Sequence, residues 1–288
     1  MKRIFGKDRA TLKGKSTRPH PPVINKNDIV EIPPELEVKG MRLELAIDVV
    51  YINDQSFLHS VDRTIKLRGV AHLGTRKKNQ NYTKEMLFEG LDTMLRYYNK
   101  NDIRVSLIHA DNEFRSIMSE LVDVWDVGIN FSMPGEHVPD IERMNRTLQE
   151  RFRVALYRLP YKIIPKVMIV RLTIRITRTA NMFPAAGGIS RYFAPSTIIT
   201  GKQVDFLKEL VFSFGDYGQG YYENNPKNNN LPRTKDCIYL QSAQGLQRGH
   251  EVMDLATGEL IRVTRFDKCV MTRLVISRVE QLAAQQGY

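Results

Sequence analysis

The sequence has few cysteines, a single tryptophan and no long hydrophobic run. Two cysteines among 288 residues, Cys237 and Cys269, cannot build a disulfide framework or, alone, supply the four ligands of a structural zinc site. The longest apolar stretches, near Val167 to Val170, fall far short of the ~20 residues that a membrane-spanning helix needs. The basic N-terminus is not followed by the apolar segment of a signal peptide. We therefore expect a soluble intracellular protein with no membrane partner.

Negative charge is also scarce. Forty-three Lys and Arg against 32 Asp and Glu give a formal net charge of +11, which favours a polyanionic partner. Residues 1–26 hold eight basic side chains and one acid, and residues 143–178 hold ten and one. We predict that residues 1–40 form a basic extended arm, either a solvated leader or a segment that touches nucleic acid. The second cluster lies on a predicted amphipathic helix and favours a surface for the phosphate backbone.

Hydrophobic periodicity predicts a mixed α/β core over residues 41–205. Apolar runs rich in β-branched residues indicate strands, and stripes with a period near 3.6 indicate helices. Residues 161–182 fit both alternation and a helical stripe, and we favour the helix. The predicted strands are 43–52, 57–61, 65–71, 103–110 and 127–131, and the other predicted helices are 83–100, 112–124 and 139–159.

The C-terminal part of the chain predicts a small separate unit. Residues 206–235 read as a partly ordered connection, because 223–235 are rich in Asn and Pro and lack periodicity. Residues 236–288 then predict an antiparallel β unit with a turn at Thr257-Gly258 and a final helix over 272–285. Its predicted strands are 237–240, 251–255 and 260–266.

Three acidic residues are candidates for catalysis because of their positions in the predicted elements. Asp48 lies inside the first apolar strand, where an unpaired charge is unfavourable. Asp111 follows the strand that ends at Ala110, and Glu142 opens the basic helix. Carboxylates brought together repel each other unless a cation joins them, and oxygen-only ligands suit Mg²⁺ or Mn²⁺. On spacing alone, three unrelated acids remain an alternative.

The segments around these acids carry a family resemblance. They read IDVVYIN at Ile47–Asn53, HADNEF at His109–Phe114 and ERMNRTL at Glu142–Leu148. The first, with the Phe57-Leu58 that follows it, resembles the first strand and hairpin of the integrase core of copia-type LTR retrotransposons. The other two resemble the second motif of that family and its Glu-Arg-x-Asn-Arg-Thr-Leu block. The resemblance covers roughly residues 41–266, since the tail from Asp254 is similar to the short β segment that follows copia cores.

This resemblance implies an RNase H-like mixed sheet flanked by helices and a polynucleotidyl transferase activity. The family uses two Mg²⁺ (or Mn²⁺) ions for 3′-end processing and strand transfer of element DNA into a chromosome. Asp48, Asp111 and Glu142 would be the catalytic, metal-binding carboxylates. Double-stranded DNA (element ends and target), a homo-oligomer and nuclear placement follow as expectations. The side chains that we expect to contact DNA are Arg143, Asn145, Arg146, Gln149 and Arg153.

Departures from the family pattern keep alternatives open, among them a stretch from Asp111 to Glu142 that is shorter than in many integrases. The second motif lacks the glycine often found inside it, and the family's upstream His-His-Cys-Cys zinc module is not seen, so we expect a fragment of a longer polyprotein or a decaying copy. The alternatives are a catalytically silent remnant that binds nucleic acid non-specifically and a ribonuclease H-type nuclease. Further polar residues near the acids are weaker candidates, and we expect them to pack or face solvent: Glu113, Glu136, His109 and His137.

Overall fold

The computed structural model describes residues 8–14, 29–38, 40–76, 82–131, 139–222, 230–243 and 249–288, which form two compact units. The core unit consists of Asn27–Val154 and Thr173–Val204. The C-terminal unit consists of Met1–Lys26, Ala155–Leu172 and Asp205–Tyr288. Two of the boundaries, before Ala155 and before Thr173, therefore fall inside the basic segment 143–178, all of which the sequence pattern places in the core.

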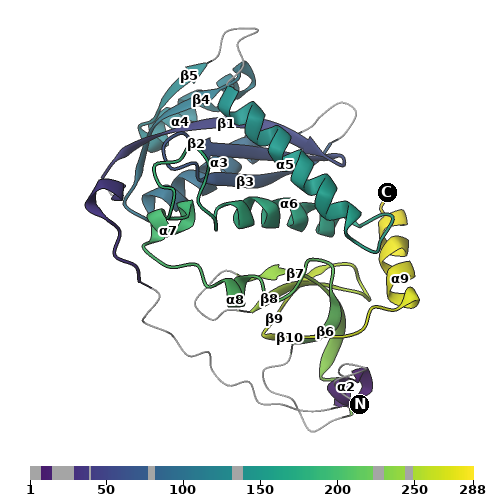
Figure 1. The fold of residues 1–288 in the computed structure, drawn as a ribbon. Helices are drawn as coiled ribbons and strands as arrows, with labels where there is room; N and C mark the ends of the chain where they lie inside the picture. Colours follow the sequence, from purple (N-terminus) through teal and green to yellow (C-terminus); the bar gives the residue numbers. More distant parts are fainter. Residues whose placement is uncertain are drawn as a thin grey trace. The chain divides into compact units, whose positions relative to one another are not determined.

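A five-stranded mixed sheet forms the centre of the core unit (Figure 1). Its spatial order is β3-β2-β1-β4-β5, with β1 in the middle. β1 pairs antiparallel with β2 and parallel with β4, β2 pairs antiparallel with β3, and β4 pairs parallel with β5. This order and these directions define an RNase H-like sheet, which confirms the predicted fold class. The strands are β1 (Arg42–Ile52), β2 (Gln55–Asp62), β3 (Arg68–Thr75), β4 (Arg104–Ala110) and β5 (Gly128–Phe131).

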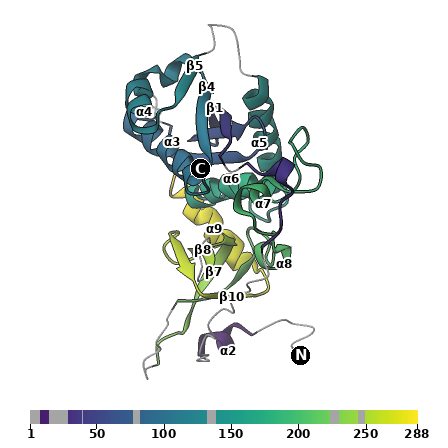
Figure 2. The same cartoon turned by 90° about the vertical axis from the view of Figure 1, so that its left-hand side faces the viewer.

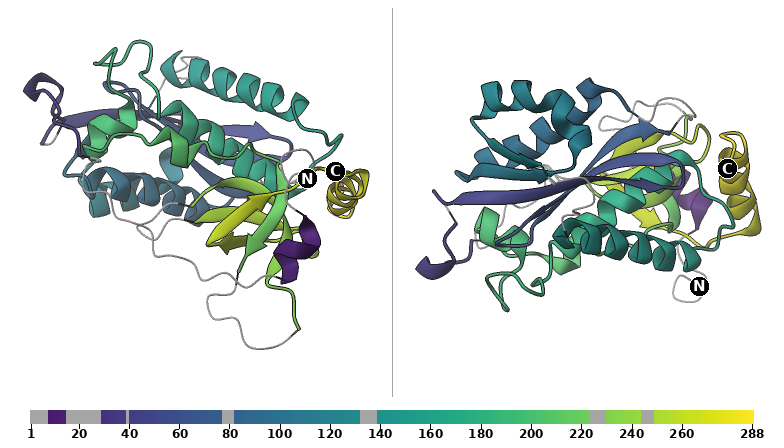
Figure 3. Two further views of the ribbon diagram at one scale, coloured as in Figure 1. Left: turned by 60° about the horizontal axis from the view of Figure 1, so that its bottom comes forward. Right: turned by 90° about the horizontal axis from the view of Figure 1, so that it is seen from above.

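Helices cover both faces of this sheet, as Figures 2 and 3 show. Alternate residues of β1 point to opposite faces. Leu45 and Ile47 belong to a large apolar cluster that also contains Leu91 and other residues of helix α3 (Lys84–Asn99). Ala46 instead joins a small cluster with Ile141 on the opposite face. The helices on the larger-cluster side are α3, the 3₁₀ turn η3 (Asn112–Ile117) and α4 (Met118–Trp125), and α5 (Pro139–Tyr157) lies on the other side.

A longer helix crosses the boundary between the two units at Thr173. Residues 161–182 contain the helix α6 (Lys166–Ala180), which confirms the helix predicted there. Two short elements that the pattern did not predict are η2 (Pro34–Leu36) and α7 (Pro195–Thr200). Within the described ranges, no helix is both long and apolar enough to cross a bilayer.

Several element boundaries in the core differ from the prediction by a few residues, and the largest differences involve the third strand and the helix 112–124. The third strand begins at Arg68 rather than 65, because a tight turn follows β2. In that turn, one carboxylate oxygen of Asp62 accepts hydrogen bonds from the backbone N–H groups of Thr64 and Ile65, at 2.9 and 2.5 Å. The predicted helix 112–124 consists of two elements, the 3₁₀ turn η3 followed by the α-helix α4.

The C-terminal unit is built around a second five-stranded sheet, which is antiparallel throughout. Its order is β10-β6-β7-β8-β9, again with one strand in the middle, β7. This sheet confirms the predicted small β unit. The strands are β6 (Tyr217–Tyr221), β7 (Thr234–Ser242), β8 (His250–Asp254), β9 (Leu260–Val263) and β10 (Arg265–Lys268), and the helices are α2 (Arg9–Gly14), α8 (Phe206–Glu209) and α9 (Arg273–Ala284).

Strand β6 was not predicted because its sequence, YGQGY, contains two glycines, which strands disfavour. The structure shows why glycine is needed there. A Cβ on Gly218 would collide with the backbone oxygen of Asp267 and the ring of Phe266. The neighbouring strand β10 therefore approaches too closely for any side chain at this position.

Candidate active site

The fold brings Asp48 and Asp111 to the same level of adjacent parallel strands. In the β1–β4 register, Leu45 lies opposite Ile108 and Ala46 opposite His109. Extending that register by two residues aligns Asp48 with Asp111, which follows the last residue of β4. Asp48 also lies on the face that carries Ala46, the side that α5 covers. Two acidic residues from distant parts of the sequence thus lie on neighbouring positions near the middle of the sheet.

The electrostatic surroundings of Asp48 include both burial and neighbouring carboxylates. Burial, together with the neighbouring carboxylates of Asp111 and Glu113, raises the pKa of Asp48 to about 6. Two hydrogen bonds act in the opposite direction and lower this pKa: one from the backbone N–H of Val49 at 2.7 Å and one from the Asn145 amide at 2.6 Å. Like charges that share a site disfavour the ionised form. A cation between these carboxylates would remove that repulsion.

Glu113 is a third carboxylate near this pair. It lies in η3, two residues after Asp111, and accepts a hydrogen bond from the Tyr82 hydroxyl at 2.5 Å. Burial and the Asp111 carboxylate raise the pKa of Glu113, although the Tyr82 hydrogen bond opposes the shift. The sequence had suggested a residue facing solvent, and much of the residue is indeed exposed, but its charge acts on Asp48. The only signal in the sequence was its closeness to Asp111.

Asn145 connects the helix α5 to Asp48. Its side-chain Nδ2 donates to Oδ2 of Asp48, and its Oδ1 lies 2.6 Å from Nδ1 of His59 on β2. We expected Asn145 to contact DNA, but in this structure both ends of its amide are engaged inside the protein. The signal for this role was a polar residue one helical turn after Ile141, on the edge of the apolar stripe of α5.

Glu142 lies one turn before Asn145 on α5 and is exposed. Residues three apart share a helix face, so Glu142 belongs to the side of α5 from which Asn145 reaches Asp48. Within the residues that the structure describes, however, no three His, Cys, Asp or Glu side chains lie close enough together to hold a metal ion. A joint site of Asp48, Asp111 and Glu142 therefore stays a prediction. The candidates Glu136 and His137 lie outside the described residues.

The outer face of α5 presents basic side chains. Arg143, Arg146 and Arg153 are exposed, and Gln149 is half-buried. Arg146 forms an ion pair with Glu150 one turn later, at 3.0 Å. An exposed pair of this kind contributes at most ~1 kcal/mol and opens readily. This face therefore keeps the charge that the sequence pattern assigned to DNA contacts.

His109, a weaker candidate, is used in a separate polar group on the same sheet. Its Nε2 lies 2.9 Å from Oε2 of Glu44 and 3.2 Å from Nη1 of Arg63, and its Nδ1 lies 3.3 Å from Nδ2 of Asn130. The His109 hydrogen bond, opposed in part by burial, lowers the pKa of Glu44. His109 thus packs with charged neighbours, as expected.

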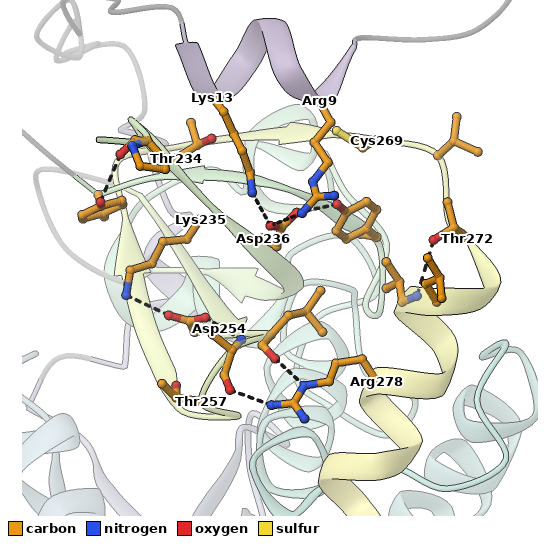
Figure 4. A pocket seen from close by; sticks show the side chains of 18 of the residues that line it. Arg9, Lys13, Thr234, Lys235, Asp236, Asp254, Thr257, Cys269, Thr272 and Arg278 are labelled. Atoms are coloured by element: carbon orange, nitrogen blue, oxygen red, sulfur yellow. Dashed lines mark hydrogen bonds and ion pairs between the residues drawn. The ribbon is translucent and has the colours of Figure 1, made fainter. Parts of the chain in front are cut away.

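The C-terminal unit contains a pocket of about 860 Å³ whose charged side chains are already paired (Figure 4). Arg9 and Lys13 from α2 both contact Oδ2 of Asp236, each at 2.6 Å. Lys235 pairs with Asp254 at 2.8 Å, and Arg278 donates to two backbone oxygens. Residues 9–14 of the predicted extended arm thus form a helix, and the two basic residues described there bind a carboxylate of this protein.

Known proteins similar to this chain are found among solved structures. No protein-family model matches it, and no curated protein matches it. Among solved structures, the catalytic core domain of BIV integrase is 15% identical with a TM-score of 0.39, covering 54% of this chain and 92% of that chain. A chain of the simian T-cell lymphotropic virus intasome in complex with the PP2A regulatory subunit B56 gamma is 12% identical with a TM-score of 0.43, covering 94% and 90%. The RNase H-like assignment itself follows from the strand order and directions, because both TM-scores are low.

Proposed function

We propose that this chain is a magnesium-dependent DNA integrase of the copia type, with Asp48, Asp111 and Glu142 as its catalytic carboxylates. The observation that carries the proposal is the alignment of Asp48 with Asp111 on the two central parallel strands of an RNase H-like sheet. The motif resemblance supports the same assignment. Asn145 adds a link between this pair and the helix that carries Glu142.

The residues at the pair fit a divalent cation. All donors there are carboxylate oxygens, the kind of ligand that Mg²⁺ prefers, and Mg²⁺ commonly needs only one or two protein carboxylates because it keeps water and substrate ligands. Burial, and to a smaller extent the carboxylates of Asp111 and Glu113, raise the pKa of Asp48, and a cation bound there would favour its ionised form. Asp48 and Asp111 would hold the first ion, and Glu142 would contribute to a second. When bound, such ions stabilise charge on phosphate oxygens and favour ionisation of an attacking hydroxyl.

The proposed reaction is strand transfer without a covalent protein intermediate. The 3′-hydroxyl oxygen of an element end attacks a phosphorus atom of the target strand. A new P–O bond forms while the bond to the target's 3′ oxygen breaks, and the proton of the attacking hydroxyl is released to solvent while the departing oxygen takes one up. The number of phosphodiester bonds stays the same. The chain's own residues hold the reacting groups close together and in line, which is a large part of such catalysis.

The exposed basic face of α5 would orient the duplex. Its arginines suit contacts with phosphate oxygens, which position DNA without reading its sequence. A multimer would hold two element ends and the target together, and the substrate would place the protein in the nucleus. These partners and this location belong to the proposal.

A strand-transfer assay tests the proposal. The full chain is incubated with Mg²⁺ or Mn²⁺, a labelled DNA duplex with a free 3′-hydroxyl and a supercoiled plasmid target, beside the variants Asp48→Asn and Asp111→Asn. We expect joined products from the wild-type chain alone. Cleavage of an RNA–DNA hybrid without joining would replace the proposal with a ribonuclease H. Salt-sensitive DNA binding without any product would leave a silent remnant and also overturn it.

A further inference from the structure

A buried histidine lies at the far end of a hydrogen-bonded chain that leads to Asp48. His59 on β2 is the antiparallel partner of Asp48 in the β1–β2 register and has no exposed surface. Asn145 from α5 lies between them, with contacts of 2.6 Å to His59 Nδ1 and 2.6 Å to Asp48 Oδ2. Three residues from two strands and one helix therefore form one connected unit.

The donors and acceptors in this unit are fixed by chemistry. The ionised carboxylate of Asp48 can only accept, so the group that Asn145 turns towards it is the NH₂ group. The amide oxygen then faces His59, and Nδ1 of His59 must carry the proton that it donates. Burial lowers the pKa of His59 to about 4, so the ring is neutral at physiological pH and the other nitrogen, Nε2, has no proton.

The second ring nitrogen of His59, Nε2, is not satisfied by the described part of the protein around it. This atom is buried and has no hydrogen-bond partner among the described residues. A buried polar atom without a partner is unfavourable by ~1–3 kcal/mol, a cost that an apolar side chain at this position would avoid. The remaining benefit of histidine here is the N–H that it presents to Asn145.

We infer that His59 is a positioning residue, which fixes the orientation of the Asn145 amide and through it holds one carboxylate oxygen of Asp48 in place. The inference rests on the proposed function, since it takes Asp48 to be a cation ligand. A carboxylate oxygen has more than one lone pair, so Asp48 keeps free acceptor sites while Asn145 and Val49 hold it. Contacts that hold a ligand in this way commonly change metal affinity 10- to 100-fold when they are removed.

Without the His59 N–H, the Asn145 amide loses one of the two contacts that distinguish its ends, and the Asp48 carboxylate alone orients it. A flipped amide would point its oxygen at Asp48 and repel the carboxylate instead of binding it. His59 thus helps to fix the orientation of the amide, although its side chain forms no hydrogen bond with Asp48. A merely structural histidine would affect folding but not the affinity of Asp48 for a cation.

The test measures Mn²⁺ affinity of the full chain without DNA, by the loss of the free-ion signal in electron paramagnetic resonance. His59→Leu removes the N–H, and His59→Asn places an amide N–H near the former Nδ1. We expect about tenfold weaker binding for His59→Leu and affinity within about threefold of wild type for His59→Asn. His72→Leu is the matched control, because His72 is a sheet histidine that contacts the neutral side chain of Gln55 at 3.0 Å. It should leave Mn²⁺ affinity unchanged.

Nitrogen NMR of the wild-type histidine side chains separates this inference from the proposed function. We expect His59 to be neutral and protonated at Nδ1, with an Asn145 amide signal that shifts in Asp48→Asn. A charged His59, or one protonated only at Nε2, would overturn the inference even if the protein binds Mn²⁺. A folded His59→Leu with wild-type Mn²⁺ affinity would also overturn it. Equal Mn²⁺ binding by wild type and Asp48→Asn contradicts the proposed function instead, and the NMR result then decides on His59.

Discussion

Each unit of this protein places one aspartate on the middle strand of a five-stranded sheet, and the two aspartates have opposite surroundings. Asp236 on β7 accepts four hydrogen bonds, from Arg9, Lys13, the Tyr217 hydroxyl and the Gln219 amide, at 2.6–2.7 Å. Burial alone would raise the pKa of Asp236, but these donors hold it far below its usual value. Asp48 on β1 is faced by carboxylates, and its pKa is raised to about 6.

This difference separates a structural carboxylate from one suited to bind a ligand. The charge of Asp236 is already compensated inside the protein, so it has little left to offer a cation. The charge of Asp48 is compensated only by two neutral donors, and a divalent ion would complete it. Strongly shifted pKa values occur at both kinds of site, so the groups that surround each carboxylate, and not the shift alone, tell them apart.

Removing the charge of Asp48 is the most direct test of the difference between Asp48 and Asp236. Asp48→Asn should reduce metal-dependent strand transfer by about 10³-fold or more, because a bound metal supplies several kcal/mol of transition-state stabilisation and each ~1.4 kcal/mol is a factor of ten. Asp236→Asn should keep its activity per folded molecule. Initial rates of joined product measure both. Equal rates for wild type and Asp48→Asn would show that the two aspartates do not differ in function.

The converse substitution tests the structural role of Asp236. Asp236→Ala leaves the Tyr217 hydroxyl and the Gln219 amide without their acceptor and separates two cations from their partner. We expect ~2 kcal/mol less protection of the β7 amides in hydrogen exchange, with Mn²⁺ affinity unchanged.

Arg9→Ala should cost less than 1 kcal/mol in the same measurement, since the Arg9 side chain is 57% exposed. A larger effect for Arg9→Ala than for Asp236→Ala would mean that α2, and not the carboxylate, stabilises this sheet.

The sequence predicted both middle strands, although the predicted range 237–240 begins just after Asp236, but it did not predict what surrounds the two aspartates. Buried strands and the acids at Asp48 and Asp111 are visible in apolar runs and local motifs. The ion pair of Arg9 with Asp236 joins residues 227 positions apart, and no local pattern records it. The contact of His59 with Asn145 likewise depends on strand register and on how α5 lies over the sheet. Strand β6 was not predicted for a different reason: its glycines lower the strand propensity of the segment, but they are needed because β10 approaches closely.

The pH dependence of the free energy of unfolding gives a further test of the surroundings of Asp48. Asp48 has a pKa of about 6 in the folded protein and about 3.9 when unfolded, so the folded state binds more protons between these values. Its stability contribution is therefore full below about pH 4 and is lost as pH rises through 6. Asp48→Asn should equal wild type near pH 4 and exceed it by roughly 2 kcal/mol at pH 7.

Urea unfolding followed by the fluorescence of Trp125 reports this difference, because this single tryptophan packs against the core cluster. Saturating Mg²⁺ should stabilise wild type and not Asp48→Asn. Parallel pH profiles for the two proteins would show that Asp48 carries no uncompensated charge.

The smallest expected effect concerns the helix that covers Asp48. Arg146→Ala should weaken binding to duplex DNA about fivefold and reduce the slope of log K against log salt by about 0.9, the value for one lost phosphate contact. Its ion pair with Glu150 is exposed, so stability should not change measurably. Arg96→Ala is the matched control, because Arg96 forms the same i,i+4 pair with Asp92 on α3, which covers the other face of the sheet. Fluorescence anisotropy across a salt series measures both. If Arg96→Ala changes the slope as much as Arg146→Ala does, DNA binds this protein through diffuse charge, and the face around Asp48 has no special part in it.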